Sequence, residues 1–235
     1  AFSGLGTYAN SVIPSKASIL ASKLNQYLYS KEEKNLNILD VNVVVGKVGL
    51  FASYDSRMFF LSKTLYAIPF WKEYVCDLSV IIAKNVGSLK KAVIFDCDNT
   101  LWDGILGEDG MSGIDMAAES KIGQIFHKVQ KIAVWLSNQG VIVGLCSKNN
   151  SDDVAKVLSS HPDMALQSSH IVISKVNWTD KATNLREISQ ELNIGLDSLV
   201  FIDDSPFEIN LIKEQIPEIL SYQVPKKLEE YPDQL

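Results

Sequence analysis

With 235 residues, of which 46% are hydrophobic and 21% charged, the chain is long enough to bury a core without disulfides or metal ions as staples. Its net charge of -6 excludes broad contact with a nucleic-acid backbone, which requires clustered Lys and Arg. The cysteines, Cys76, Cys97 and Cys146, share no C-x-x-C spacing, so neither a disulfide framework nor a zinc knuckle is expected. No apolar run approaches the roughly 20 residues that span a bilayer. We therefore expect a cytoplasmic protein.

Residues 1–88 carry no recognisable chemistry and are predicted to form an N-terminal α/β extension with the order helix, strand, helix. Between Ser15 and Lys34, apolar residues recur at helical spacing with charged residues opposite, which predicts an amphipathic helix. The stretch from Leu36 to Val45 is rich in β-branched residues and favours a strand. The stretch from Met58 to Ala83 favours a packed helix, in which Cys76 is expected to be buried.

From residue 89 onward, short apolar runs alternate with amphipathic stretches of helical length. Strands are predicted at 92–96, 141–146, 170–174, 198–202 and near 219–223, and helices near 118–139 and at 152–160, 181–192 and 206–215. This alternation predicts βαβ units and a mostly parallel sheet with helices on both faces. Residues 105–116 are too few for a large cap domain and predict a short flap. Ligands of such sheets bind beyond the carboxyl ends of the strands.

Acidic residues follow two of the predicted strands. Asp96 and Asp98 stand at positions i and i+2 after a buried strand, so strand periodicity places them on one side. Asp203 and Asp204 follow the fourth strand. Four carboxylates on one rim would raise one another's pKa, and a divalent cation would relieve the repulsion. Because Mg²⁺ prefers oxygen ligands and keeps several waters, we predict a magnesium site at Asp96, Asp98, Asp203 and Asp204, with Asp96 and Asp203 as direct ligands.

The other predicted site residues are basic or polar. Lys181 begins the helix between the third and fourth strands, where its long side chain can reach the same rim. With charge neutralised by Lys181 and the cation, an ionised Asp96 can attack phosphorus and form an aspartyl phosphate. Asp98 then protonates the leaving oxygen and later activates water. The predicted phosphate-binding residues are Thr100, Ser147, Lys148 and Asn149.

In this order, D-x-D-x-T at Asp96 to Thr100, Ser147, Lys181 and the pair Asp203-Asp204 resemble motifs one to four of the haloacid dehalogenase (HAD) superfamily. Receiver domains of two-component signalling use similar residues, but in a different order along the sheet. The resemblance implies an HAD-type Rossmann-like fold over residues 89–235 and a Mg²⁺-dependent phosphotransferase.

Longer segments resemble the FkbH-like family within that superfamily, and weaker similarity extends upstream to about Leu36. These segments are Asp96 to Gly104, Gly107 to Gly110, His161 to Met164, Asn177-Trp178 and Phe201 to Glu208. Members of the family act in polyketide biosynthesis. They take a glyceryl or D-lactyl group from a phosphorylated three-carbon acid such as 1,3-bisphosphoglycerate, remove phosphate, and load the acyl group on the phosphopantetheine arm of an acyl carrier protein. The resemblance implies the same acyltransferase and phosphatase activity here, with neither nucleic acid nor a membrane as partner.

Acyl transfer in that family is understood to pass through a cysteine thioester, and Cys97 is the best-placed candidate nucleophile. Strand alternation, however, points Cys97 away from Asp96 and Asp98, as expected of a buried structural cysteine. Cys146, inside a predicted strand, is expected to be structural. Two other functions stay open: a plain HAD phosphatase for a small metabolite or phosphoprotein, and an inactive docking domain of a synthase.

Overall fold

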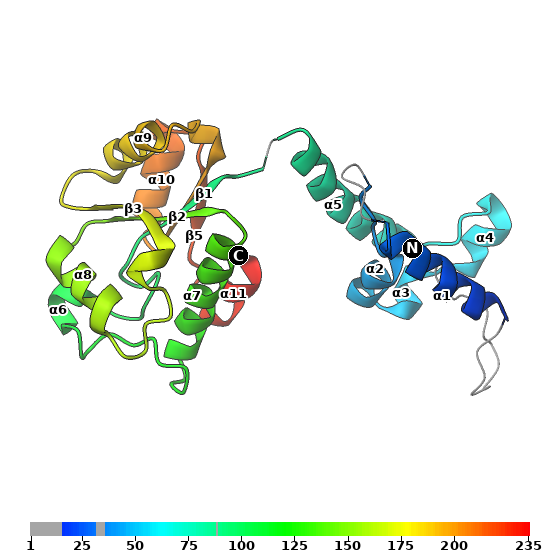
Figure 1. The fold of residues 1–235 in the computed structure, drawn as a ribbon, viewed down its shortest axis with the longest axis horizontal. Helices are drawn as coiled ribbons and strands as arrows, with labels where there is room; N and C mark the ends of the chain where they lie inside the picture. Colours follow the sequence, from blue (N-terminus) through cyan, green and yellow to red (C-terminus); the bar gives the residue numbers. More distant parts are fainter. Residues whose placement is uncertain (1–15, 32–35, 88) are drawn as a thin grey trace. The chain divides into compact units, whose positions relative to one another are not determined.

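The computed structural model describes residues 16–31, 36–87 and 89–235 (Figure 1). The chain divides into two compact units, Ala1–Leu89 and Lys90–Leu235. The described part of the first unit is helical, whereas the second is α/β. Over these three described ranges, no helix is both long and apolar enough to cross a bilayer.

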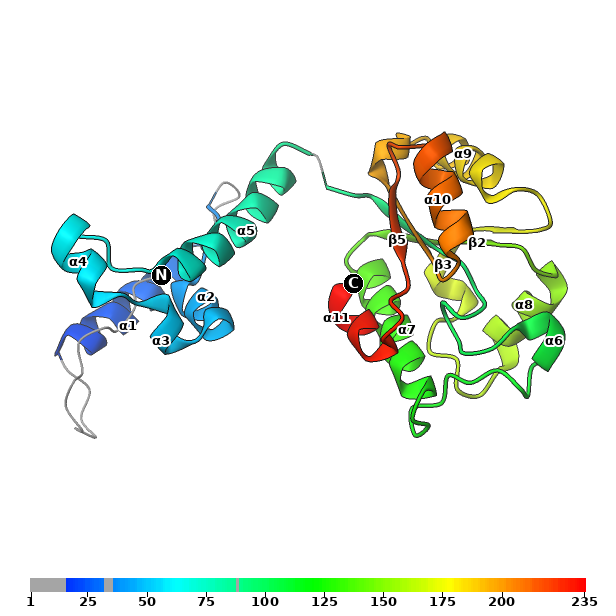
Figure 2. The ribbon, with the colours of Figure 1, turned by 180° about the vertical axis from the view of Figure 1, so that it is seen from behind.

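The described part of the N-terminal unit is made of helices, two of which pack against α5. Its helices are α1 (Lys16–Tyr29), α2 (Val41–Val48), α3 (Leu50–Ser53), α4 (Ser56–Ser62) and α5 (Ile68–Asn85). Both α2 and α3 pack against α5 (Figure 2). Val44 in α2 and Phe70 in α5 are buried. Helix α1 agrees with the predicted amphipathic helix, although Ser15 and residues 32–34 lie outside the described residues.

The predicted strand from Leu36 to Val45 is wrong, because α2 occupies the second half of that range. Asp40 is the N-cap of α2, and its carboxylate accepts a hydrogen bond from the backbone N–H of Asn42 at 2.9 Å. A capped first turn that buries Val44 outweighs the β preference of neighbouring valines. In the described part of this unit, β pairing is limited to a single bridge, so the predicted α/β extension is corrected to a helical one.

The predicted helix from Met58 to Ala83 is two helices, α4 and α5. The first ends at Ser62, and its C-cap residue, Lys63, has a left-handed φ of 59°. The second begins with Pro69 in its first turn, where the missing N–H of proline costs little. Cys76, expected to be buried, is exposed on α5.

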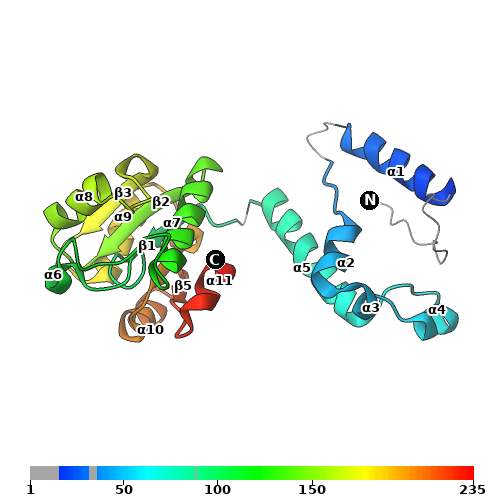
Figure 3. The same cartoon turned by 90° about the horizontal axis from the view of Figure 1, so that it is seen from below.

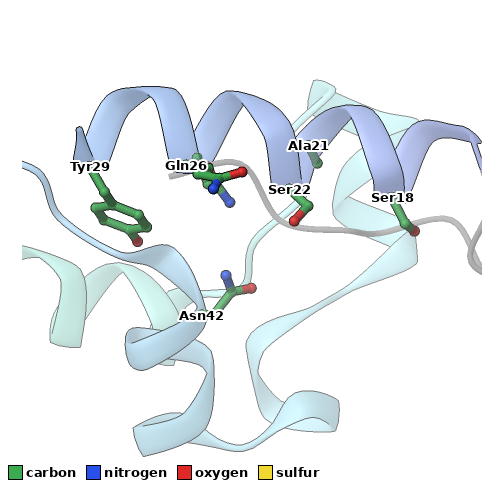
Figure 4. A pocket seen from close by; sticks show the side chains of 7 residues that line it. Ser18, Ala21, Ser22, Gln26, Tyr29 and Asn42 are labelled. Atoms are coloured by element: carbon green, nitrogen blue, oxygen red, sulfur yellow. The ribbon is translucent and has the colours of Figure 1, made fainter. Parts of the chain in front are cut away.

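Helices α1 and α2 line a cavity within the N-terminal unit (Figure 4). Its lining is rich in hydroxyl and amide groups, among them those of Ser22, Gln26 and Asn42. Tyr29 also lines it, and its hydroxyl donates a hydrogen bond to Asp40 at 3.0 Å. The cavity contains none of the predicted site residues.

The second unit is built on a five-stranded parallel sheet. Its strands are β1 (Ala92–Phe95), β2 (Ile142–Ser147), β3 (Ile171–Val176), β4 (Leu199–Asp203) and β5 (Leu220–Gln223), in the order β3-β2-β1-β4-β5. All four neighbouring pairs are parallel. Each predicted strand is confirmed, and β1, the first of them, lies in the middle of the sheet.

Helices cover both faces of this sheet. One face carries α7 (Gly123–Asn138), α8 (Ser151–Ser160) and α11 (Tyr231–Gln234), and the other carries α9 (Lys181–Glu191) and α10 (Pro206–Gln215). Figure 3 shows α7 beside α11. Along β1, Val93 and Phe95 enter the core under α7, whereas Ala92 and Ile94 enter the core under α9 and α10. This alternation between two buried faces explains why the strand is a continuous apolar run.

The segment between β1 and α7 is a short flap, as predicted, and residues 89–235 contain no large cap domain. The flap holds α6 (Leu106–Asp109) and returns through an antiparallel bridge between Asp103 and Asp115. Gly104 has a φ of 100°, and a Cβ atom there would lie 2.9 Å from the carboxylate of Asp109. Glycine is therefore required where the flap leaves the sheet.

Candidate active site

The two central strands deliver acidic residues to the same edge of the sheet. Asp96 directly follows β1, and its backbone N–H donates to the carbonyl of Ile202 in β4 at 2.9 Å, which extends the ladder by one residue. Asp203 is the last residue of β4, and Asp204 follows it. Because neighbouring parallel strands end at one edge, residues more than a hundred positions apart in sequence meet there.

Lys181 joins two of these carboxylates in a buried cluster of charges. Its ammonium nitrogen lies 2.6 Å from Asp203 Oδ2 and 3.1 Å from Asp96 Oδ2. The exposed fractions of the three residues are 4% for Lys181, 0% for Asp203 and 6% for Asp96. Burial alone lowers the pKa of Lys181, but attraction to Asp96 and Asp203 outweighs burial and raises that pKa. Lys181 therefore stays charged, and its two carboxylate partners offset the cost of burying the ammonium group.

The remaining negative charge fits a divalent cation. Carboxylate oxygens of Asp96, Asp203 and Asp204 lie within 4.8 Å of one another. Asp96 Oδ1 is buried, and the described residues provide it with no hydrogen-bond partner. Burial and repulsion from Asp96 raise the pKa values of Asp203 and Asp204. A buried, partnerless oxygen in a group of hard acidic ligands is the donor set that Mg²⁺ prefers.

Asp98 has different surroundings from Asp96. Its Oδ1 atom accepts hydrogen bonds from the indole N–H of Trp102 and the backbone N–H of Leu106, both at 3.0 Å. Its Oδ2 atom accepts one from the side-chain amide of Asn149 at 2.8 Å. Burial raises the pKa of Asp98, and these hydrogen bonds oppose that effect. The acidic cluster in the described chain consists of Asp96, Asp203 and Asp204. It does not include Asp98, although the sequence predicts that the Asp98 side chain binds the metal.

The predicted phosphate-binding residues lie around the same edge but differ in what they contact. Ser147 ends β2 and is buried. The side-chain amide of Asn149 donates to Asp98, and its side-chain oxygen accepts a hydrogen bond from the backbone N–H of Asn150 at 3.2 Å. Thr100 Oγ1 is buried, with no hydrogen-bond partner in the ranges that the structure describes. The amide of Asn149 is thus already engaged with the neighbouring carboxylate, while Ser147 and Thr100 keep hydroxyl groups near the strand ends.

Lys148, the fourth of these residues, forms an ion pair that the sequence did not predict. Its ammonium lies 2.7 Å from Glu208 Oε1. Glu208 belongs to α10 and is 7% exposed, and Oε2 has no hydrogen-bond partner within the described residues. Sixty positions separate the two residues, so no local spacing could have indicated the pair. Trp102 was missed in the same way, although both Trp102 and Glu208 lie inside the segments that carry the family resemblance.

Cys97 lies between the two catalytic candidates but points into the core. It is 0% exposed and packs in the hydrophobic cluster under α7, together with Leu101 and Trp102. Burial, and then repulsion from Asp96, raise the pKa of the thiol well above its usual value, while a hydrogen bond with Ser147 lowers it. The alternation of side chains along an extended strand predicts that Cys97 points away from Asp96 and Asp98, and the structure confirms it. Cys146 is buried under the opposite helices, as expected of a structural cysteine.

The parallel sheet, its order, its two helical layers and its uncapped strand ends define the HAD-type, Rossmann-like α/β fold. The chain is similar to the N-terminal part of the protein BF1531 from Bacteroides fragilis, which contains a phosphatase domain and was solved in complex with Mg. Sequence identity is 33% and the TM-score 0.81, over 97% of this chain and 61% of that one. This chain thus spans less than two thirds of the length of its relative.

Other solved structures are less similar. A 3-deoxy-D-manno-octulosonate 8-phosphate phosphatase from Moraxella catarrhalis is 18% identical with a TM-score of 0.38, over 57% of this chain and 68% of that one. An HAD-family enzyme from Bacteroides thetaiotaomicron is 12% identical with a TM-score of 0.40, over 57% and 93%. No family model and no curated protein matches the chain.

Proposed function

We propose that this chain is a Mg²⁺-dependent phosphatase whose nucleophile is Asp96. The observation that carries the proposal is the surroundings of the Asp96 carboxylate: one oxygen beside the Lys181 ammonium, the other buried without a partner in the described chain. A carboxylate has two oxygens, so Asp96 can contact a cation with one and attack phosphorus with the other, while Lys181 and the cation balance its charge. The similarity to the phosphatase-containing part of the B. fragilis protein supports the same conclusion.

The proposed reaction has two steps. In the first, an oxygen of Asp96 forms a bond to phosphorus while the bond from phosphorus to the leaving oxygen breaks, and Asp98 gives its proton to that oxygen. In the second, water attacks the aspartyl phosphate and gives a proton back to Asp98, and the Asp96 carboxylate and inorganic phosphate are released. The sum is hydrolysis of a phosphate ester, with both aspartates regenerated.

Asp96, Asp203 and Asp204 would hold the Mg²⁺ ion, which would supply positive charge to the phosphoryl oxygens and screen the carboxylates from one another. Lys181 forms ion pairs with both Asp96 and Asp203, so its positive charge lies beside the proposed nucleophile. We propose that Ser147, at the end of β2, and Thr100, in the loop after β1, donate hydrogen bonds to the phosphoryl group.

Phosphate release from a panel of phosphate esters tests this function. The purified chain should release phosphate with Mg²⁺ and should stop when excess EDTA is added, with activity returning when Mg²⁺ is restored. Undiminished release in EDTA would contradict the metal requirement. Absence of release from every ester and acyl phosphate in the presence of Mg²⁺ would contradict the function.

We further propose that the substrate is a phosphorylated three-carbon acid and that the chain loads its acyl group on an acyl carrier protein through Cys97. The support is the resemblance of Asp96 to Gly104 and of Phe201 to Glu208 to the FkbH-like family. The uncapped site also fits a large partner. Because the Cys97 thiol is buried, acyl transfer requires a local movement of the loop after β1.

The Cys97→Ala variant tests the acyl step separately from hydrolysis. Wild-type protein given 1,3-bisphosphoglycerate should gain one acyl group through a hydroxylamine-sensitive bond, and the variant should gain none while still releasing phosphate. Alanine keeps both neighbouring carboxylates and leaves only a small cavity in the core. Carrier loading by the variant at the wild-type rate would rule out Cys97 as the acyl acceptor.

A further inference from the structure

The indole of Trp102 connects the hydrophobic core to the carboxylate of Asp98. Trp102 is fully buried in the cluster under α7, so packing fixes the direction of its N–H group. A buried indole N–H needs an acceptor, since leaving it unsatisfied is costly. The acceptor is Asp98 Oδ1, at 3.0 Å. The contact therefore serves core stability and also holds one oxygen of Asp98.

The same oxygen receives a second hydrogen bond from a different segment. Leu106 is the first residue of α6, and its backbone N–H lies 3.0 Å from Asp98 Oδ1. Asn99 closes the loop between Asp98 and Leu106. Its side-chain oxygen accepts a hydrogen bond from the N–H of Gly104 at 3.1 Å, and its own backbone has a φ of 51°. A carboxyl oxygen has two lone pairs in its plane, and two N–H donors occupy both. Oδ1 thus has no lone pair left for a proton.

The other oxygen of Asp98 is less restricted. Oδ2 accepts one hydrogen bond, from the amide of Asn149 at 2.8 Å. This leaves one lone pair that can carry a proton. The two oxygens of Asp98 are therefore unequal before any substrate binds.

We infer that Trp102 is a positioning residue for Asp98: with the Leu106 amide it keeps Oδ1 as an acceptor, so that the proton passed to the leaving group is carried on Oδ2. This inference rests on the proposed phosphatase function. In the first step the O–H bond at Oδ2 breaks as the leaving oxygen takes the proton and separates from phosphorus. In the second step a proton of the attacking water returns to Oδ2. Trp102 is fully buried, so it acts on the reaction only through Asp98.

The dependence of the rate on the leaving group tests this role in Trp102→Phe. p-Nitrophenolate leaves without a proton, whereas an alkoxide must be protonated as it departs. General acid catalysis contributes about 10² to 10⁴ in rate where it is needed, so a displaced acid should slow the first step on an alkyl phosphate. The second step is the same for both esters and does not enter kcat/KM, so we compare kcat/KM and expect the variant to lose about tenfold more of it on ethyl phosphate than on p-nitrophenyl phosphate.

Two further variants separate positioning from packing. Val129→Ala removes volume from the same core without touching Asp98, and any loss of rate it causes should be equal on both esters. Leu106→Pro removes the second N–H donor at the first position of a helix, where proline is tolerated, and should show the same leaving-group dependence as Trp102→Phe. It keeps the test decisive if Trp102→Phe does not fold, as judged by circular dichroism.

The possible results differ in what they overturn. Equal losses on the two esters in Trp102→Phe and Leu106→Pro, or no loss in either, would refute the positioning role while leaving the phosphatase function intact. Wild-type protein inactive on both esters with Mg²⁺ would refute the phosphatase function and this inference with it. A loss confined to the alkyl ester supports the assignment of the proton to Oδ2.

Discussion

Asp96 and Asp98 stand two residues apart on one loop, yet their carboxylates have opposite surroundings. Asp96 lies beside an ammonium and two other carboxylates, and in the described chain one of its oxygens is without a partner. Asp98 accepts three hydrogen bonds from neutral N–H groups. A carboxylate with balanced charge and an open oxygen fits a nucleophile, and one held by neutral donors fits a proton carrier. Equal spacing from the strand therefore does not make two carboxylates equivalent, because their partners set their chemistry.

Removing the charge of Asp96 should cause the largest loss of phosphate release. In Asp96→Asn the amide keeps the shape but cannot form the aspartyl phosphate, so we expect phosphate release to fall about a thousandfold or more. Release of phosphate measured with Mg²⁺, alongside circular dichroism, checks this. Asp103→Asn is the matched control, since Asp103 lies in the flap outside the acidic cluster and should keep most of the activity. Near-wild-type release by Asp96→Asn would remove Asp96 from the mechanism.

Changing Asp98 instead should separate the two steps. Asp98→Asn still has the nucleophile but cannot carry a proton, so turnover should fall about a hundredfold or more. With p-nitrophenyl phosphate the first step needs no acid, and we expect a burst of nitrophenol equal to the enzyme concentration, followed by slow turnover. Stopped-flow absorbance measures the burst. Loss of the burst together with turnover would mean that Asp98 is needed before or during the first step even for this leaving group.

Removing Asp203 should affect the metal rather than the proton. In Asp203→Ala the acidic cluster loses one of its three members, and we expect the Mg²⁺ concentration for half-maximal activity to rise about tenfold or more. A Mg²⁺ titration of phosphate release measures the change. The leaving-group dependence should stay as in wild type, because the hydrogen bonds of Asp98 are untouched. An unchanged Mg²⁺ requirement would exclude Asp203 as a ligand.

The smallest effect is expected from removing a hydrogen bond that supports the loop carrying both aspartates. The hydroxyl of Tyr231, fully buried in α11, donates to the carbonyl of Thr100 at 3.2 Å. In Tyr231→Phe this carbonyl loses its donor, which should cost about 1 kcal/mol, equivalent to a fall in Tm of about 3 °C. Thermal unfolding followed by circular dichroism measures it, and phosphate release should stay within about twofold of wild type. A large loss of activity with unchanged Tm would give Tyr231 a role in catalysis instead.

Much of the second unit follows from local patterns. The apolar run before Asp96 predicts a buried strand, and the alternation of such runs with amphipathic stretches predicts the parallel sheet. In the first unit the same approach fails at α2, because β-branched residues favour a strand while the Asp40 cap and the packing of Val44 favour a helix. Propensity is a weak signal where tertiary contacts and caps compete with it.

By itself the sequence determined where the strands end and which ionisable residues follow them, since periodicity, breakers and residue type act over a few positions. It also indicated that Cys97 points away from its neighbours, because side chains alternate along a strand. Only the tertiary structure decided which groups meet. The Lys148–Glu208 pair and the contact between Asp98 and Asn149 join residues 60 and 51 positions apart. Such contacts depend on how strands and helices are ordered around the sheet, and no local pattern records which donor reaches which carboxylate oxygen.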